Sequence, residues 1–332
     1  MRVLVTGGTG FVGLTLAQAL LERGDEVVLF DRRAPAPLFL ERMAPHAARL
    51  AAVEGDVLSD DDVGRAFAGG GVTHVFHGAA ITAGPQREAA EPWRVMEVNL
   101  GGTVRVLQAA ARAGVRRAVY PSSLTVYGRH IAERETVSEA GTPPEPDTLY
   151  GITKYAGEGT ALRLGGLWGM DTVAGRIGSV FGPWEGETGA RDMVSPFAQV
   201  AAAAARGQAV VLPGAYPRRE MIYGPDLAAA LVALLTRPAP AHRCYNLSAN
   251  LDWADSLARW CEALRKRLPG FAWRYAQDGE PASIDFYGAT PRAGMDSARL
   301  REDLGVLPRY GRDAALAHYA DWVAGHRAYF NS

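Results

Sequence analysis

A tyrosine and a lysine four residues apart, Tyr150 and Lys154, are the side chains of this sequence best suited to move a proton. Residues four apart on a helix lie on one face, one above the other. A free tyrosine titrates at about pH 10, but an ammonium group beside it favours the phenolate. Such a pair takes a proton from an alcohol or returns one to a carbonyl oxygen. The spacing alone is common on exposed helices, so its meaning depends on the elements around it.

The composition indicates a globular chain with a large core. Its 332 residues are 48% hydrophobic with a net charge of −1, which gives no reason to expect nucleic acid or an acidic membrane surface as a partner. Two cysteines, Cys244 and Cys261, are typical of a reducing compartment. No apolar run reaches the ~20 residues that span a bilayer, and no signal peptide is recognised. We therefore expect a soluble cytoplasmic protein.

A glycine-rich turn follows the first predicted strand. Residues 2–6 are apolar and β-branched, Gly7 to Gly13 contain four glycines, and a helical pattern runs from there to Gly24 before a second strand over residues 26–31. In this context, glycines let backbone N–H groups approach a pyrophosphate at the helix N-terminus. The sequence therefore predicts a dinucleotide cofactor.

Asp31 ends the second predicted strand, 18 residues after Gly13. A carboxylate at this place accepts hydrogen bonds from an adenosine ribose diol and repels a 2′-phosphate. This favours NAD as the cofactor. Arg32 and Arg33 leave NADP as the alternative, because arginine binds phosphate well.

Strands and helices continue to alternate. Strands are predicted at residues 51–53, 73–77 and 117–121, and helices at 60–68, 92–113 and 150–168. This order predicts an α/β fold with a doubly wound parallel sheet and a ligand at the carboxyl ends of the strands. Gly101 and Gly102 interrupt the predicted long helix, which indicates a kink or the close approach of another element.

The order of motifs resembles that of the extended short-chain dehydrogenase/reductases, in the NAD-dependent epimerase/dehydratase family. The matching stretches are TGGTGFVG at 6–13, Asp31, GDV at 55–57, HGAA at 77–80, Asn99, SSLTVYG at 122–128, YGITK at 150–154, RIGSVFGP at 176–183 and RREMIYGPD at 218–226. The resemblance implies a Rossmann domain that binds NAD, formed by residues 1–175 and about 219–248. It implies a smaller α+β substrate domain formed by residues 176–218 and 249–332.

The resemblance also implies residue roles. Tyr150 would be the acid/base, Lys154 would bind the nicotinamide ribose, and Ser123 would hydrogen-bond the reacting oxygen, with Ser122 as the alternative. The implied cofactor contacts are Gly7, Gly10, Phe11, Val12, Asp31, Arg32, Asp56, Val57, Ala79, Ala80, Asn99, Ser122, Tyr150, Lys154 and Ile177. The implied substrate contacts are Thr82, Ser123, Ser179, Met193, Arg219 and Arg292.

The substrate positions depart from the pattern of the UDP-sugar enzymes. Ser179 stands where those enzymes usually carry asparagine, Met193 and Val194 replace an asparagine–leucine pair, and Thr82 stands where 4-epimerases often have lysine. Arg219 matches an arginine that contacts a diphosphate, with Arg292 near the place of a second, but two arginines grip a carboxylate equally well. These departures favour a smaller sugar, sugar acid or polyol.

Three functions follow. In the first, NAD oxidises a secondary hydroxyl and leaves as NADH; in the second, a UDP-sugar 4-epimerase keeps NAD bound and returns the hydride. The third is a non-catalytic dinucleotide sensor, which an intact Ser123, Tyr150 and Lys154 disfavours. Leu124 and Thr125 replace the acidic pair that a dehydratase needs. Scattered histidines predict no metal site.

The remaining predictions concern the second lobe and assembly. Helices are expected at 196–206, 226–235 and 313–329, with a strand at 210–212. A further helix at 253–268 carries a core stripe with Trp253, Trp260 and Leu264. The family resemblance implies a homodimer through the helices at 92–113 and 150–168.

Overall fold

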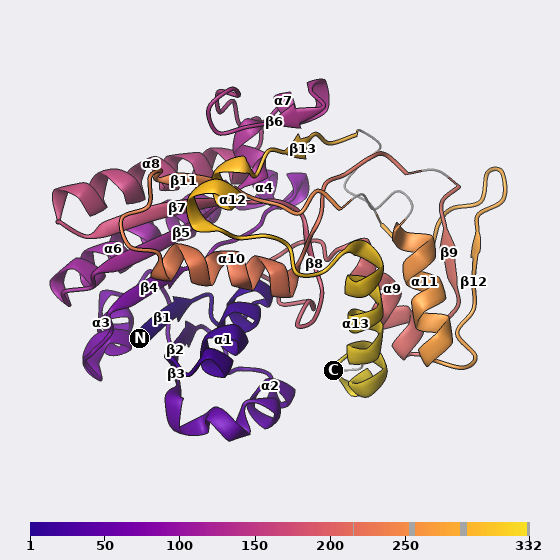
Figure 1. The fold of residues 1–332 in the computed structure, drawn as a ribbon, viewed down its shortest axis with the longest axis horizontal. Coiled ribbons are helices and arrows are strands. Elements are labelled where there is room, and N and C mark those ends of the chain that lie inside the picture. Colours follow the sequence, from indigo (N-terminus) through magenta and orange to yellow (C-terminus); the bar gives the residue numbers. More distant parts are fainter. Residues whose placement is uncertain (215, 252–255, 286–290, 331–332) are drawn as a thin grey trace.

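A seven-stranded parallel sheet forms the centre of the computed structural model, which describes residues 1–214, 216–251, 256–285 and 291–330. The strands follow the order β11-β7-β5-β4-β1-β2-β3 (Figure 1). Their bounds are Arg2–Thr6 (β1), Glu26–Asp31 (β2), Leu50–Glu54 (β3), His74–His77 (β4), Arg117–Ser123 (β5), Asp171–Ile177 (β7) and Cys244–Leu247 (β11). The order reverses between β1 and β4, where doubly wound sheets bind ligands. The predicted fold class is confirmed.

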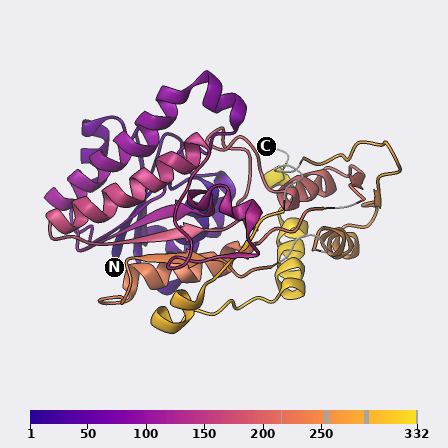
Figure 2. The ribbon, with the colours of Figure 1, turned by 90° about the horizontal axis from the view of Figure 1, so that it is seen from above.

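Helices cover both faces of the sheet. Alternate side chains of a strand point to opposite faces, so Val3 and Val5 pack into one hydrophobic core while Leu4 packs into the other. The first face carries α1 (Phe11–Arg23) and α10 (Gly224–Thr236), and the second carries α3 (Asp60–Ala68), α6 (Gly102–Arg112) and α8 (Leu149–Leu167). Figure 2 shows α10 in orange and α8 in magenta on opposite sides of the strands.

Two sheet strands, β7 and β11, were not among the predicted strands. Each carries a buried polar residue that interrupts the apolar run expected of a central strand. In β7, Arg176 pairs with Glu158 of α8 at 2.7 Å, and in β11 the Asn246 side chain accepts a hydrogen bond from the Tyr127 hydroxyl at 2.8 Å. These partners come from distant parts of the chain, so the strand pattern alone does not reveal them.

The predicted helix over residues 92–113 is interrupted. It consists of α5 (Pro92–Met96), a π-helical turn (Glu97–Gly101) and α6. A Cβ atom added to Gly102 would lie 2.7 Å from Cγ2 of Val57, so a close approach accounts for this glycine. The π-helical turn is the irregular part of this segment.

The second lobe lies beyond the carboxyl edge of the sheet (Figure 1). There α9 (Pro196–Ala205), α11 (Ser256–Arg267) and α13 (Arg312–Gly325) pack through aromatic rings, with Trp260 and Tyr319 stacked at 4.6 Å between centroids. Leu257, Trp260 and Leu264 of α11 are buried, as expected, whereas Trp253 lies outside the described residues. Within the described residues, no helix is long and apolar enough to cross a membrane.

The other elements are short. They are the helices α2 (Pro37–Arg42), α4 (Pro85–Ala90), α7 (His130–Glu133) and α12 (Ala298–Leu304), the 3-10 turns Ala44–Arg49, Leu124–Tyr127 and Arg327–Phe330, and the strands β6 (Thr136–Val137), β8 (Val180–Phe181), β9 (Val210–Leu212), β10 (Ile222–Tyr223), β12 (Trp273–Tyr275) and β13 (Gly294–Met295). The strand predicted over residues 210–212 is confirmed as β9.

Two glycines of α8 give a matched test of how this helix packs on β5. A Cβ atom at Gly157 would lie 2.1 Å from the Tyr120 hydroxyl oxygen, whereas one at Gly159 would meet no described atom within 4 Å. We expect Gly157→Ala to lower the free energy of unfolding by about 1–3 kcal/mol through overpacking. Gly159→Ala should raise it by about 0.5–1 kcal/mol, because alanine favours the helix. Urea denaturation checks both, and equal effects of the two changes would contradict this packing.

Candidate active site

A groove at the carboxyl edge of the sheet brings together most of the predicted cofactor residues. It is lined by Gly7, Thr9, Gly10, Phe30, Asp31, Arg32, Arg33, Gly55, Asp56, Val57, Gly78, Ala79, Ala80, Ile81, Val98, Thr188 and Ala190. Parallel strands end at this edge, and β1, β2 and β4 each pass directly into a lining segment. Eight of the predicted cofactor contacts are in this lining: Gly7, Gly10, Asp31, Arg32, Asp56, Val57, Ala79 and Ala80.

The glycine turn provides room for a phosphate group. Gly7 has φ +64°, and a Cβ atom there would lie 2.7 Å from the carbonyl carbon of Gly78. Gly10 caps α1 without a side-chain hydrogen bond in the described structure, so the first N–H groups of α1 keep their capacity to bind an anion. The turn therefore fits the pyrophosphate of a dinucleotide.

Asp31 and Asp56 place carboxylates at the groove. The Asp31 side chain accepts hydrogen bonds from the backbone N–H groups of Thr9 at 3.1 Å and Arg32 at 2.7 Å, which fix its direction. Asp56 accepts hydrogen bonds from the Leu58 N–H at 3.0 Å and the Arg94 guanidinium at 3.1 Å. An acid at the end of β2 fits a ribose diol.

Seven predicted cofactor contacts lie outside this lining: Phe11, Val12, Asn99, Ser122, Tyr150, Lys154 and Ile177. Phe11 and Val12 pack against the core in the first turn of α1, and Ile177 packs there at the end of β7. Asn99 is buried, and its amide accepts a hydrogen bond from the Ile81 N–H at 2.7 Å and donates to the Ile81 carbonyl and the Thr153 hydroxyl, each at 3.0 Å. Asn99 therefore joins the end of the β4 loop to the helix that carries Lys154.

Tyr150 and Lys154 lie in the first turns of α8, on the same face as predicted. Thr148 starts this helix by accepting a hydrogen bond from the Gly151 N–H at 3.1 Å. The Lys154 ammonium nitrogen lies 5.9 Å from the centre of the Tyr150 ring and 4.9 Å from that of Tyr120. No carboxylate among the described residues pairs with Lys154, and burial lowers its pKa to about 7.

The two serines at the end of β5 differ in environment. The Ser123 hydroxyl oxygen accepts two hydrogen bonds from Thr125, one from its backbone N–H at 3.2 Å and one from its hydroxyl at 3.0 Å. The hydroxyl hydrogen of Ser123 therefore remains available to donate. Ser122 is more deeply buried, and its hydroxyl has no partner among the described residues. Ser122 is in register with Arg176, which reaches Glu158 of α8, so Ser122 faces the layer between sheet and helix. This favours Ser123 as the donor to a ligand.

Three of the predicted substrate residues, Ser179, Arg219 and Arg292, lie beside a buried carboxylate that the sequence did not reveal. Glu220 accepts hydrogen bonds from the Ser179 N–H at 2.7 Å and the Ser248 hydroxyl at 2.7 Å, and burial raises its pKa. Arg292 lies close enough to oppose that shift, and Arg219 is buried next to Glu220 in the chain. The motif RREMIYGPD contains a signal for this buried acid. Its glutamate lies beside two arginines at the start of an apolar run, and a charged side chain buried there requires hydrogen-bond or ion-pair partners.

A segment of residues 186–192, which we call the strap, covers part of the groove. Thr188 and Ala190 line the groove, and Thr82 binds the strap through its N–H to the Ala190 carbonyl at 2.8 Å and its carbonyl to the Asp192 N–H at 3.3 Å. Thr82 therefore anchors the strap through its backbone. Met193 follows directly after the strap. Nothing in the local sequence indicates this pairing, which joins segments about a hundred residues apart.

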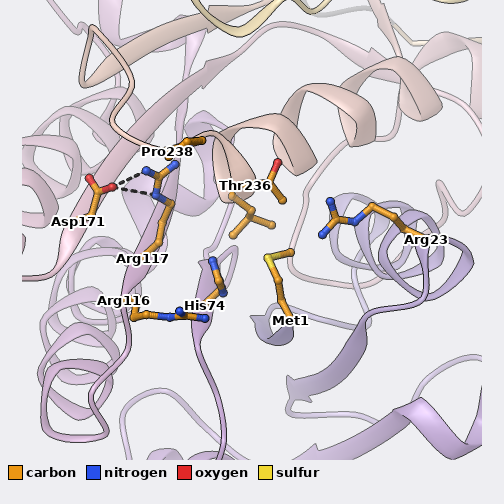
Figure 3. Close-up of a pocket in the computed structure, with 9 residues that line it drawn as sticks. Met1, Arg23, His74, Arg116, Arg117, Asp171, Thr236 and Pro238 are labelled. Carbon is orange, nitrogen blue, oxygen red and sulfur yellow. Dashed lines mark hydrogen bonds and ion pairs between the residues drawn. The ribbon is translucent and has the colours of Figure 1, made fainter.

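A second cavity lies at the opposite, amino edge of the sheet (Figure 3). Its charged lining includes Arg23, Arg116, Arg117 and Asp171. Asp171 holds the Arg117 guanidinium, and Asp25 holds Arg23. This cavity shares no lining residue with the cofactor groove. No group of three metal-binding side chains occurs in the part of the chain that the structure describes.

The burial of Lys154 predicts a pH dependence of stability. Its pKa is about 7 in the folded protein against 10.5 in a free side chain. Between these values the unfolded chain binds more protons, so the free energy of unfolding rises with pH. Relative to Lys154→Met, the cofactor-free protein should gain about 2–3 kcal/mol from about pH 7 to about pH 9.5. Urea denaturation of both proteins measures this, and a constant difference would contradict it.

Comparison with known proteins gives similar chains along the whole length. The chain is 33% identical to a 3 beta-hydroxysteroid dehydrogenase/Delta 5→4-isomerase of Mycobacterium tuberculosis, over 95% of this chain and 88% of that protein. It is 37% identical to a 3-beta-hydroxysteroid dehydrogenase of Mycolicibacterium neoaurum, over 54% of this chain and about half (48%) of that relative's length. The first alignment covers nearly all of this chain, and the second covers about half of it.

Solved structures and a family model agree. The UDP-glucose 4-epimerase of Thermus thermophilus in complex with NAD superimposes with a TM-score of 0.79 at 26% identity, over 98% of this chain and all of that chain (100%). The sequence model of the NAD dependent epimerase/dehydratase family matches residues 3–248. NAD is the cofactor of this family, and the groove fits it. The chain belongs to the NAD-dependent epimerase/dehydratase family of enzymes.

Proposed function

We propose that the protein is an NAD-dependent dehydrogenase that oxidises a secondary hydroxyl of a sugar, sugar acid or similar polyol. The observation that supports this proposal is the pair of Tyr150 and the buried Lys154 on α8, a helix that Asn99 joins through Thr153 to Ile81 in the lining of the cofactor groove. Ser123, with its hydrogen available, supplies a donor at the carboxyl end of β5. These groups are what the oxidation of an alcohol requires.

The proposed reaction divides the work among three side chains. Ser123 donates a hydrogen bond to the substrate oxygen, and the Tyr150 oxygen takes the hydroxyl proton as the carbon–oxygen double bond forms. NAD, when bound, accepts the hydride that leaves the carbon. Lys154 favours the phenolate form of Tyr150. Because burial has stripped water from Lys154, ribose hydroxyls beside its nitrogen would stabilise the ammonium form.

The proposed cofactor contacts follow the groove. Gly7 and Gly10 hold the pyrophosphate, Asp31 accepts from the adenosine ribose, and Asp56 and Val57 flank the adenine. The same proposal divides the chain into the two domains expected from the sequence, with the substrate between them. Arg219 and Arg292 then face an anionic group of the substrate, such as a carboxylate.

Two other substrate classes have their own support. The near full-length relative from Mycobacterium tuberculosis supports a 3β-hydroxysteroid as the alcohol. The structural likeness to a UDP-glucose 4-epimerase supports an epimerase that retains NAD. Thr82, Ser179 and Met193 lack the lysine and amide groups typical of the UDP-sugar enzymes, so the dehydrogenase is the stronger proposal.

We also propose a cytoplasmic homodimer. Trp93 of α5 is 73% exposed, and Val104, Ile152 and Tyr155 on the neighbouring α6 and α8 are also exposed. Apolar side chains grouped on adjacent helices are typical of a protein interface. The two thiols, Cys244 and Cys261, are free, which supports a reducing compartment.

One assay distinguishes the candidates. The purified protein is incubated with NAD and a panel of sugars, sugar acids, a 3β-hydroxysteroid and UDP-glucose, and NADH is followed by absorbance. Net NADH with a sugar or sugar acid supports the proposal, while net NADH with the steroid alone reassigns the substrate. Interconversion of UDP-sugars without net NADH supports the epimerase, and cofactor binding without any turnover supports the sensor.

Tyr150→Phe tests the proposed chemistry. It should lower kcat by at least about 10²-fold, because it removes the proton acceptor alone. Binding of NAD, measured by calorimetry, should persist. Turnover close to that of the unmodified enzyme would overturn the assignment of Tyr150.

A further inference from the structure

The short helix α4 (Pro85–Ala90) contacts both the strap and the catalytic helix. On the strap side, the Arg87 guanidinium donates to the Gly189 carbonyl at 2.9 Å and to the Asp192 carboxylate at 3.0 Å. The other Asp192 oxygen accepts a hydrogen bond from the Gly84 N–H at 2.8 Å. Three hydrogen bonds thus fasten the start of α4 to the segment that covers the cofactor groove.

The neighbouring residue of α4 contacts the first turn of α8. The Glu88 carboxylate accepts a hydrogen bond from the backbone N–H of Tyr150 at 3.0 Å. The first N–H groups of a helix have no partner within the helix. The Thr148 hydroxyl accepts a hydrogen bond from the N–H of Gly151, not from that of Tyr150. Glu88 therefore supplies the acceptor for the residue that carries the proposed acid/base, and its negative charge suits a helix N-terminus.

We propose that α4 is a positioning link between the cofactor groove and Tyr150, with Arg87 and Glu88 as its two ends. When the strap lies over the groove, Arg87 fixes α4, and Glu88 then fixes the first turn of α8. This inference rests on the proposed role of Tyr150, because a link to that residue matters only if Tyr150 reacts. A misplacement of about 1 Å at a reacting group lowers the rate by up to about 10²-fold, so such a link affects turnover.

Hydrogen–deuterium exchange at the Tyr150 amide tests the link without any substrate. The Asp192 carboxylate contacts Gly84 and Arg87, and neither residue is part of α8. With saturating NAD, we expect Asp192→Ala to speed exchange at the Tyr150 amide by at least about 10-fold, because α4 loses two of its three hydrogen bonds to the strap and Glu88 is then held less firmly. The amide of Val173, inside β7, serves as an internal reference.

Variants of α4 complete the test. Glu88→Ala should speed the same exchange by a similar factor, whereas Glu88→Gln should largely restore protection, because an amide oxygen also accepts a hydrogen bond. Gln86→Ala, an exposed position on the same helix, is the matched control. The double variant Asp192→Ala/Glu88→Ala should exchange no faster than Glu88→Ala alone, because both changes act through one contact.

Other outcomes would overturn the link. The first is an unchanged exchange rate of the Tyr150 amide in Asp192→Ala. The second is an equal exchange rate in Glu88→Gln and Glu88→Ala, and the third is an additive increase of the rate in the double variant.

Failure of the link can be distinguished from failure of the proposed function. If Tyr150→Phe retains turnover, the function is wrong; if it loses turnover while the exchange results contradict α4, only the link is wrong. With an identified substrate, Asp192→Ala should also lower kcat by about 10-fold at saturating NAD.

Discussion

The burial of one ammonium group, that of Lys154, is the constraint on which the active site depends. Removing a charge from water without pairing it is costly, and no described carboxylate pairs with this one. The rings of Tyr120 and Tyr150 lie beside the ammonium group and provide a cation–π contact. They leave its pKa lowered to about 7. The site is thus prepared for hydroxyl groups that a bound ligand would bring.

The fold holds α8 against the sheet at several points to maintain that burial. Gly157 lets the helix approach Tyr120, the Asn99 amide reaches Thr153, and Glu158 pairs with Arg176 of β7. A buried pair of this kind adds little net stability, but it fixes position, because either partner alone would be an unpaired buried charge. The helix that carries Tyr150 and Lys154 is therefore located by contacts at Thr153, Gly157 and Glu158.

The sequence predicted those parts of the structure that depend on local patterns. The glycine turn, the strand ending at Asp31 and the i, i+4 pair on α8 each follow from neighbouring residues. In the structure the first two line one groove, and the pair lies together on one helix. Long-range contacts were beyond such patterns. The strap binds Thr82, which lies about a hundred residues earlier in the chain. Strand β11 contains the buried Asn246, which interrupts the apolar pattern by which a central strand is predicted.

The same distinction explains why the cofactor is identified more firmly than the substrate. The cofactor groove is built largely from strand ends and the turns that follow them, which motifs describe well. The proposed substrate side combines Ser179, Glu220 and Arg292 with Ser248, and these come from segments that share no local motif. Their meaning depends on a ligand whose shape the side chains alone do not specify.

The most direct test of this account is a measurement of the Lys154 pKa. Lys154 and Lys266 are the only lysines in the sequence, so labelling with [¹³Cε]lysine gives two resonances, and Lys154→Met assigns them. Without cofactor, we expect the Lys154 resonance to titrate at about pH 7, and addition of NAD should move that midpoint upward. A Lys154 midpoint near the ordinary value of 10.5 in the cofactor-free protein would contradict the account, because the ammonium group would then not be desolvated beside Tyr150.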